Sequence, residues 1–270
     1  MLLTETHAHL GDEAFKEDRD AVIEKSFSAG VGKIIEIACS AEEWESASEL
    51  CAKYPSKIYA CFGLHPANTA QLCPENLAEL EKYLKKSVSR GVGEIGLDYY
   101  WDPSLKERQS LLLEAMLSLS NRLALPAVFH ARSGRAPAGG DAYEDLAGAL
   151  KGGWSYSPRG KKFRGVLHCF SGGRGDASAA LDLGLALGVN GTFTYKKNDE
   201  LREIIRSAGM GNIVFETDCP YLPPQEARGK RNDPSYMPAI AGAVAAYLGI
   251  AAGQAAEAAA ENSAEIFGAL

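Results

Sequence analysis

The chain has 270 residues, of which 46% are hydrophobic and 23% are charged. These values are ordinary for a globular protein, and they exclude a largely disordered chain, a collagen-like chain and a small disulfide scaffold. The formal net charge of −7, from 28 basic and 35 acidic residues, argues against a protein that coats DNA through a broad basic face.

Short apolar or β-branched runs alternate with longer amphipathic segments along the chain. The short runs predict strands at 2–5, 33–38, 58–63, 91–96, 127–129, 165–167, 186–189 and 213–216. The segments between them carry apolar residues at helical spacing, and they predict helices at 14–29, 42–53, 75–88, 105–122, 177–185 and 199–207.

Eight strands that alternate with helices indicate a parallel sheet, and eight such units in about 250 residues match a closed (β/α)8 TIM barrel. The alternative is an open, doubly wound α/β sheet. Its dinucleotide fingerprint, GxGxxG, is absent after the first strand, where ETHAHLG stands. We therefore expect one TIM-barrel domain over residues 1–270.

Two regions depart from this rhythm. Residues 133–164 are long for a crossover and hold a Gly/Pro-rich loop, a helical piece (DAYEDLAGAL) and a second loop, so they are interpreted as an insertion. The basic run KKFR in this insertion is either a nucleic-acid contact or a solvated loop, and the solvated loop is favoured because short basic runs are commonly surface features. The Ala-rich segment 251–270 predicts a helix that closes the barrel.

Targeting and membrane signals are weak. The chain has no apolar run of 18 residues, and the first residues, MLLTETHAHLGDE, lack the basic segment of a signal peptide. The six cysteines form no CxxC pair and are expected to be free thiols. We expect a cytoplasmic protein without a membrane partner or a stable protein partner.

All five histidines follow predicted strands. His7 and His9 follow the first strand, His65 the third, His130 the fifth and His168 the sixth. The carboxyl ends of all strands in a TIM barrel open onto one face, so these side chains should converge there. Residues i and i+2 of an extended strand point to the same side, so His7 and His9 can ligate one ion.

Two acidic residues lie at the same face. Glu94 is on the fourth predicted strand and Asp218 follows the eighth, both in apolar runs where an unpaired carboxylate is costly to bury. Six potential ligands exceed the three or four of one catalytic zinc, so two divalent ions bridged by a shared carboxylate account for them better. Imidazole and carboxylate ligands suit Zn²⁺, Mn²⁺ or Mg²⁺.

Each residue alone has a plainer explanation. An isolated HxH is more often a surface or core feature, Asp before Cys-Pro is a common turn former, and Glu94 could pair with an arginine. The combination of four histidines and two acids at one barrel face favours a metal site. Imidazoles of His7 and His130 more than about 10 Å apart would contradict it, because bridged ions lie only a few ångströms apart.

The sequence also resembles a known family. ETHAHL, GLHP, GEIGLDYY, FHAR, HCFSGG, ETDCPYLPP, RGKRNDPSYMP and ENSAEIF occur in the order of the TatD-type metal-dependent deoxyribonucleases, from about Leu3 to Phe267. The resemblance implies a TIM barrel with two divalent metal ions. The family usually opens with Asp-Thr-His, whereas this chain has Glu5 in place of that Asp, and the extra methylene can shift a hydrogen bond behind the ligands.

The resemblance also implies roles for individual residues. His7, His9 and Asp218 would hold the first ion, His130 and His168 the second, and Glu94 would bridge them. His65 resembles the family's non-ligand histidine near the substrate phosphate. Arg132 and Asn232 fall in motifs that line the same cleft.

These observations lead to the hypothesis that the protein hydrolyses DNA phosphodiester bonds. The ions would activate water, Asp218 could accept its proton, and His65 and Arg132 could orient the phosphate. Cleavage from a 3′ end and incision at abasic sites both remain open. The acidic net charge suggests contact with a short stretch of strand, so binding should weaken only gently with salt.

Two other functions remain as alternatives. The same ions could polarise the carbonyl of an ester, lactone or amide, because one fold hosts many chemistries. A degenerate barrel that only binds a ligand is disfavoured, because no proposed ligand residue is missing. Trp101, next to Tyr99 and Tyr100, either stacks on a base or caps the barrel rim, and rim packing is favoured.

Overall fold

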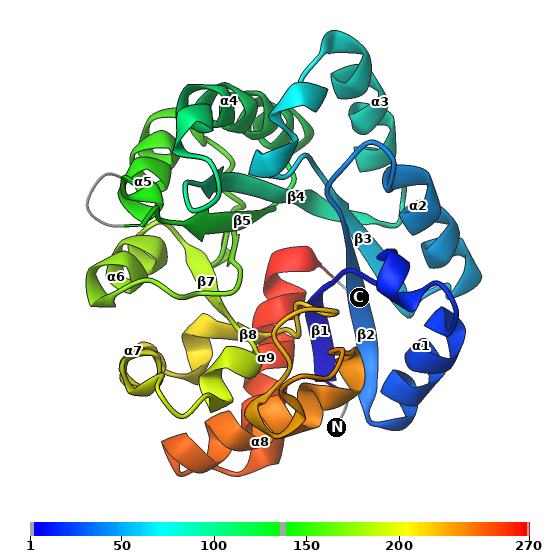
Figure 1. Ribbon diagram of the computed structural model, residues 1–270, viewed down its shortest axis with the longest axis vertical. Coiled ribbons are helices and arrows are strands. Elements are labelled where there is room, and N and C mark those ends of the chain that lie inside the picture. Colours follow the sequence, from blue (N-terminus) through cyan, green and yellow to red (C-terminus); the bar gives the residue numbers. More distant parts are fainter. Residues whose placement is uncertain (1–2, 136–138, 269) are drawn as a thin grey trace.

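A computed structural model describes residues 3–135, 139–268 and 270 of the chain. Eight parallel strands form one sheet in sequential order, which curls into a barrel (Figure 1). The strands are β1 (Leu3–Ala8), β2 (Val31–Ala38), β3 (Ile58–Phe62), β4 (Ser89–Asp98), β5 (Ala127–Arg132), β6 (Gly165–Leu167), β7 (Leu185–Val189) and β8 (Ile213–Phe215).

The barrel is nearly closed between β8 and β1. One isolated parallel bridge joins Ala8 to Cys219, and the Asp218 N–H donates to the carbonyl oxygen of His7 at 2.9 Å. The hydroxyl of Thr6 also donates to the carbonyl oxygen of Phe215 at 3.0 Å. The seam therefore holds Asp218 beside the end of β1, where the first two histidines lie.

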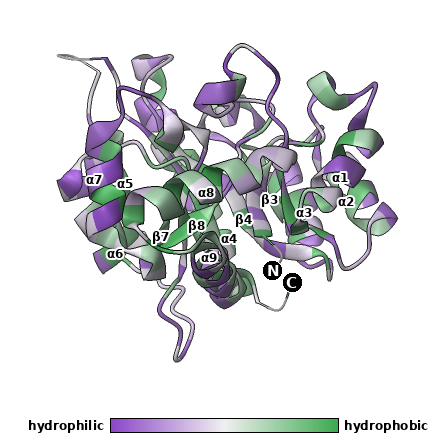
Figure 2. Ribbon diagram, turned by 90° about the horizontal axis from the view of Figure 1, so that it is seen from below, coloured by the Kyte–Doolittle hydropathy of each residue, from purple (hydrophilic) through white to green (hydrophobic). Residues whose placement is uncertain are grey.

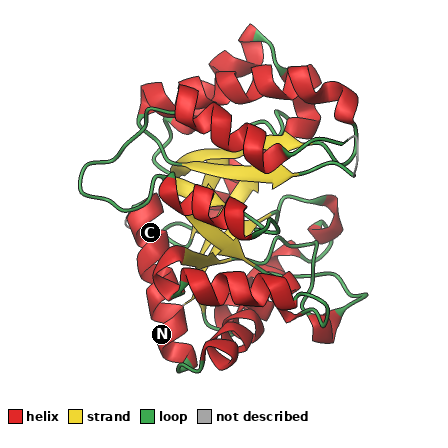
Figure 3. Ribbon diagram, turned by 90° about the vertical axis from the view of Figure 1, so that its left-hand side faces the viewer, coloured by secondary structure: helices red, strands yellow, loops and turns green. Residues whose placement is uncertain are grey.

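Helices surround the strands on the outside of the barrel (Figure 3). Apolar residues gather along the strands and on the helix faces toward them, while hydrophilic residues lie on outer turns and loops (Figure 2). The α-helices are α1 (Arg19–Ser28), α2 (Trp44–Lys53), α3 (Pro74–Leu84), α4 (Lys106–Leu123), α5 (Ala142–Gly153), α6 (Arg174–Asp182), α7 (Asp199–Ala208), α8 (Met237–Leu248) and α9 (Ala252–Phe267).

The apolar core has two parts. The larger lies between the strands and the outer helices. The smaller combines inward-facing strand residues with the end of α9, and it consists of Ile35, Ile37, Cys61, Val128, Phe163, Val166, Ala186, Val214, Ile266 and Phe267. The last turn of α9 thus fills the amino end of the barrel, which confirms the expected closing helix.

The predicted TIM barrel is confirmed, but several element boundaries were wrong. β1, β4 and β5 continue past the predicted ends, so His7 and His130 lie within strands rather than after them. The predicted helix 14–29 is a short 3-10 turn followed by α1, and α8 was not predicted. Strand pairing continues through polar residues, and a prediction based on apolar runs does not include them. Leu2 and residues 136–138 and 269, which fall in predicted segments, lie outside the described residues.

The segment interpreted as an insertion contains a regular part of the barrel. Asp141 caps α5 by accepting hydrogen bonds from the N–H groups of Tyr143 and Glu144, and α5 is the helix that follows β5. The basic run then returns to the amino end, where the Lys161 and Lys162 ammonium groups donate to the carbonyl oxygens of Glu265 and Gly211. KKFR therefore anchors the segment beside α9, at the end of the barrel opposite the histidines.

Over the described residues, no single helix is long and apolar enough to cross a membrane. The stretches Pro234–Leu248 and Ala252–Phe267 reach that length and composition only as a pair bent by 111°.

Candidate metal centre

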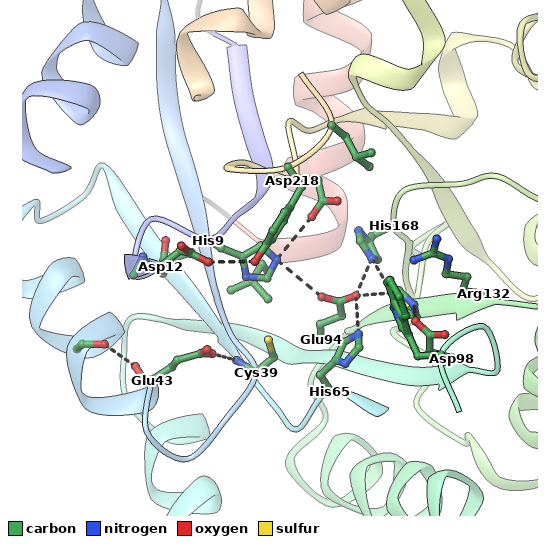
Figure 4. Close-up of a pocket in the computed structure, with 18 residues that line it drawn as sticks. His9, Asp12, Cys39, Glu43, His65, Glu94, Asp98, Arg132, His168 and Asp218 are labelled. Atoms are coloured by element: carbon green, nitrogen blue, oxygen red, sulfur yellow. Dashed lines mark hydrogen bonds and ion pairs between the residues drawn. The ribbon is translucent and has the colours of Figure 1, made fainter. Parts of the chain in front are cut away.

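A cavity of about 500 Å³ lies at the carboxyl ends of the strands. Its walls carry residues from the ends of β1 to β6 and from the turn after β8 (Figure 4). Among them are His9, Glu36, Cys39, His65, Glu94, Asp98, Trp101, His130, Arg132, His168, Asp218 and Tyr221. The convergence expected from the strand order is therefore present, with fully buried His7 directly behind His9.

The first group of potential ligands comes from β1 and the turn after β8. The Nε2 atoms of His7 and His9 are 3.2 Å apart. Asp218 Oδ1 lies 3.8 Å from His7 Nε2 and 3.6 Å from His9 Nε2. Three donor atoms thus face one point.

The second group comes from β5 and the end of β6. His130 Nδ1 and His168 Nε2 are 3.2 Å apart. The ring centroids of His7 and His168 are 3.9 Å apart and those of His168 and His130 are 5.4 Å apart. The His7 and His130 rings therefore lie within the roughly 10 Å that a bridged pair of ions requires.

Glu94 on β4 lies between the two groups (Figure 4). Its Oε2 atom is 3.3 Å from His7 Nε2, while its Oε1 atom is 2.7 Å from His130 Nδ1 and 2.6 Å from His168 Nε2. Each oxygen of one carboxylate thus faces a different pair of histidines, which is the arrangement a bridging ligand needs.

The donor set fits divalent metal ions. Two ligand atoms bound at about 2.0–2.1 Å to one ion are separated by roughly 3.0–3.4 Å, and both imidazole pairs have this spacing. His130 Nε2 lies 3.1 Å from Asp98 Oδ2, so in neutral His130 the proton is on Nε2 and the lone pair of Nδ1 faces Glu94 Oε1. Two acceptors that close require a positive charge between them, either a second proton or a cation.

Asp98 also places His130. A carboxylate that accepts the N–H of a ligand imidazole fixes the tautomer and orientation of the ring. The other oxygen of Asp98 accepts the Tyr100 N–H at 2.8 Å, which holds the carboxylate in place. Gly96, between Glu94 and Asp98 on β4, has a φ of +143°, and a Cβ there would collide with the carbonyl oxygen of His130. A glycine is therefore required for β4 and β5 to approach this closely.

His65 has its tautomer fixed by the backbone. The Ala67 N–H donates to His65 Nδ1 at 3.0 Å, so the ring proton lies on Nε2. Nε2 points into the cavity and lies 3.8 Å from Glu94 Oε1. Burial lowers the pKa of His65 to about 4, so the ring is neutral near pH 7. In this tautomer His65 presents an N–H donor to the cavity.

Two more buried carboxylates lie behind the first group and behind His168. Glu5 Oε1 accepts the N–H groups of His7 and Thr217, both at 2.9 Å, and so ties β1 to the turn that carries Asp218. Burial raises the pKa of Glu5 to about 8. Glu216 Oε1 accepts the Cys169 N–H and lies 3.7 Å from His168 Nδ1. Glu5, which is one methylene longer than the Asp usual at this position in the family, thus accepts hydrogen bonds from backbone N–H groups behind the ligands.

The electrostatics of the cluster are dominated by burial and mutual charge. Burial alone would raise the pKa of Glu94, but His168 and His7 hold it well below its usual value. Burial and then the neighbouring His168 lower the pKa of His7. Burial opposes charge on His9 as well, yet the neighbouring Asp218 and Cys39 side chains raise its pKa well above the ordinary value. Glu94 therefore carries its negative charge among the surrounding imidazoles.

The two residues assigned to substrate contact differ in position. Arg132, exposed at the end of β5, lines the cavity. Asn232 is fully buried, and its amide donates to the carbonyl oxygens of Thr217 at 2.9 Å and Tyr221 at 2.6 Å, which holds the turn around Asp218. Direct contact between Asn232 and a substrate stays a prediction, whereas its position suits it to support this turn.

Sequence reasoning missed several residues of the site. Asp98 lies four residues after Glu94 on the same face of β4, so the alternation of a strand could have found it. Glu36 accepts the N–H groups of Leu10 and Gly11 and so holds the loop after His9. No motif in the sequence signals this contact, because it joins two separate strands.

The fold and the site were compared with known proteins. A sequence model described as TatD related DNase matches residues 4–268. The chain belongs to this TatD-related DNase family. The match includes every residue of the candidate metal cluster, which consists of His7, His9, Glu94, His130, His168 and Asp218.

Individual relatives agree with this assignment. The chain is 31% identical to the metal-dependent hydrolase YabD of Bacillus subtilis over 90% of both proteins. It is 30% identical to the 3′-5′ ssDNA/RNA exonuclease TatD of Erwinia tasmaniensis, over 96% of this chain and 97% of that protein. The crystal structure of the TatD homologue YjjV of Escherichia coli superposes with a TM-score of 0.87 at 31% identity, covering 98% of this chain and 97% of that one. This TatD-family chain is a metal-dependent hydrolase.

Proposed function

We propose that this TatD-family protein hydrolyses phosphodiester bonds of DNA, with two divalent ions in the cluster. The observation that carries the proposal is Glu94, whose two oxygens face two separate imidazole pairs. His7, His9 and Asp218 would hold one ion, His130 and His168 the other, and Glu94 would bridge them. The ions would lower the pKa of a bound water and offset charge on the phosphoryl oxygens.

The chain's own residues supply the remaining functions. Asp218 accepts the proton of the attacking water, whose oxygen bonds to phosphorus while the bond to the leaving oxygen breaks. His65 donates its Nε2 proton in a hydrogen bond to a phosphoryl oxygen, because Ala67 fixes that tautomer. The Arg132 guanidinium at the cavity wall offers paired N–H donors to the same phosphate.

One set of assays tests both the class of bond that is cleaved and the end of the strand at which cleavage begins. Single-stranded DNA, duplex DNA, a bis-aryl phosphodiester and a panel of lactones are assayed on one preparation with Mg²⁺, Mn²⁺ or Zn²⁺. We expect DNA cleavage that depends on the metal, with release of nucleotides from a 3′ end. Bound metal with lactone hydrolysis and no cleavage of any phosphodiester would reject the nuclease proposal.

A further inference from the structure

Three large apolar side chains are strongly exposed among the described residues: Trp101 (73%), Leu111 (57%) and Tyr221 (54%). Two of them, Trp101 and Tyr221, line the metal cavity, while Leu111 lies on α4. Exposed aromatic rings beside a cavity that holds titratable groups are candidates for ligand contact, because their apolar faces stay in water until a ligand covers them.

Trp101 lines two neighbouring cavities. Beside the metal cavity lies a second cavity of about 450 Å³, lined by Tyr100, Trp101, Pro103, Arg135 and Gly139. Both volumes lie in the usual range of small-molecule sites, roughly 300–1,000 Å³. A ligand that extends from the metal cluster across Trp101 would enter the second cavity.

Two arginines lie beside Tyr100 and Trp101. The Arg132 guanidinium lies 3.8 Å from the ring centroid of Tyr100 and 5.4 Å from that of Trp101. Arg135 lies 4.5 Å from the Tyr100 centroid and donates to its hydroxyl at 2.7 Å. Within the described part of the chain, neither guanidinium has a carboxylate within ion-pair distance. Both charges are therefore available to an anion, in a chain whose net charge is −7.

We propose that Trp101 is a stacking platform for an unpaired nucleobase, and that the second cavity is a nucleotide subsite next to the metal cluster. The base stacks on the Trp101 ring, and Arg135 pairs with the phosphate that links this nucleotide to the next. This inference rests on the proposed nuclease function and deepens it by assigning the residue that contacts the base and the residue that contacts the next phosphate. A paired base cannot reach the platform, because its faces are covered by neighbouring base pairs.

The kinetic test compares Trp101→Ala, Trp101→Phe and Leu111→Ala with the parent on an oligothymidylate strand and on its duplex. Stacking predicts that Trp101→Ala raises KM on the single strand about ten-fold, with kcat within about two-fold. Trp101→Phe should restore most of the loss, because it keeps an aromatic face. Leu111→Ala removes another exposed apolar side chain, one that lines neither cavity, so it is the matched control and should behave like the parent.

Modified strands locate the stacked base. Each of the last three thymidines in turn is replaced by an abasic residue. At one position the replacement should raise KM for the parent and cause little further change in Trp101→Ala. An unchanged KM for Trp101→Ala on the intact strand, or additive penalties at all three positions, would overturn the platform.

A binding measurement separates this inference from the nuclease proposal. Trp44 and Trp154 are buried, so oligothymidylate added in the presence of EDTA should quench mainly the fluorescence of Trp101. Quenching that is lost in Trp101→Phe, in a protein that cleaves no strand, would support the platform and refute only the nuclease function. Equal quenching in the parent and Trp101→Phe would refute the platform.

Discussion

The two ends of the barrel bury different kinds of side chain. At the amino end, Ile266 and Phe267 of α9 pack on inward-facing valines and isoleucines of the strands. At the carboxyl end, the barrel buries imidazoles and carboxylates, with Glu94 only 3% exposed. One end lowers the free energy of folding by removing apolar surface from water, while the other concentrates charges that no apolar packing can stabilise.

This difference indicates which end carries stability and which carries chemistry. The buried Nδ1 atoms of His7 and His168 and the Oε2 atoms of Glu5 and Glu216 have no hydrogen-bond partner within the described residues. Such groups are costly in a protein interior, and they persist where function requires them. Substitutions at the two ends should therefore affect different properties.

The largest expected effect is on activity, at the carboxyl end. His130→Ala removes one of the two donors of the second group and should lower kcat/KM by at least about a thousand-fold, because a catalytic ion contributes several kcal/mol to the barrier. The free energy of unfolding of the metal-free protein should change little. Phosphodiester hydrolysis and urea unfolding measure the two quantities, and activity near the parent level would contradict the assigned role.

The largest expected effect on stability is at the amino end. Phe267→Ala leaves a cavity where α9 closes the barrel and should lower the free energy of unfolding by about 3–5 kcal/mol. The kcat at 25 °C should stay near that of the parent, since the metal cluster lies at the other end. Phe267→Leu is the control and should cost much less. A variant as stable as the parent would show that α9 does not hold the core.

A pH-dependent effect of about 3–4 kcal/mol is expected from Glu36. Burial raises its pKa from 4.5 to about 7 in the folded protein, and each unit is worth about 1.4 kcal/mol. Because the folded state binds the proton more tightly, this contribution is fully present below pH 4.5 and is lost as the pH rises through 7. Unfolding of the metal-free parent and of Glu36→Gln is measured from pH 4 to 8.

The difference between those two profiles is the diagnostic quantity. The stability of the parent should fall relative to Glu36→Gln across that range. The same substitution at exposed Glu13 controls for the loss of one carboxylate. Parallel profiles for the parent and Glu36→Gln would contradict a buried, protonated Glu36.

A smaller effect is expected at Asp98. Asp98→Ala removes the carboxylate that accepts the His130 Nε2 proton at 3.1 Å, so the ring is no longer held in one tautomer. Loss of such a partner typically lowers metal affinity 10- to 100-fold. Activity should therefore recover as the metal concentration rises, unlike that of His130→Ala. A kcat that stays low at saturating metal would show that Asp98 acts directly in the reaction.

The sequence predicted the barrel and the convergence of the histidines because both follow from strand order. Residues after successive parallel strands must meet at one face, so His65 and His168 could be placed together without coordinates. Asp98 was missed because the predicted strand ended at Gly96, although the ladder continues through Leu97 to Asp98. The helix α8 was missed because its residues are apolar on nearly every side and show no helical period.

Contacts between distant segments could not be predicted at all. Glu36 on β2 holds the loop after His9, and Lys161 binds the end of α9, although neither pair is close in sequence. The fixed tautomer of His65 depends on one backbone N–H in the turn that follows it. The chemistry of the side chains limits which contacts are possible, whereas the packing of the folded chain determines which of them form.

In the proposed site, one ion lies on either side of Glu94. The most direct test is a crystal structure of the Mn²⁺-loaded protein with anomalous scattering recorded at the metal edge. We expect two peaks, one among His7, His9 and Asp218 and the other between His130 and His168, each next to a different oxygen of Glu94. A single peak, or peaks that leave either imidazole pair without an ion, would contradict it.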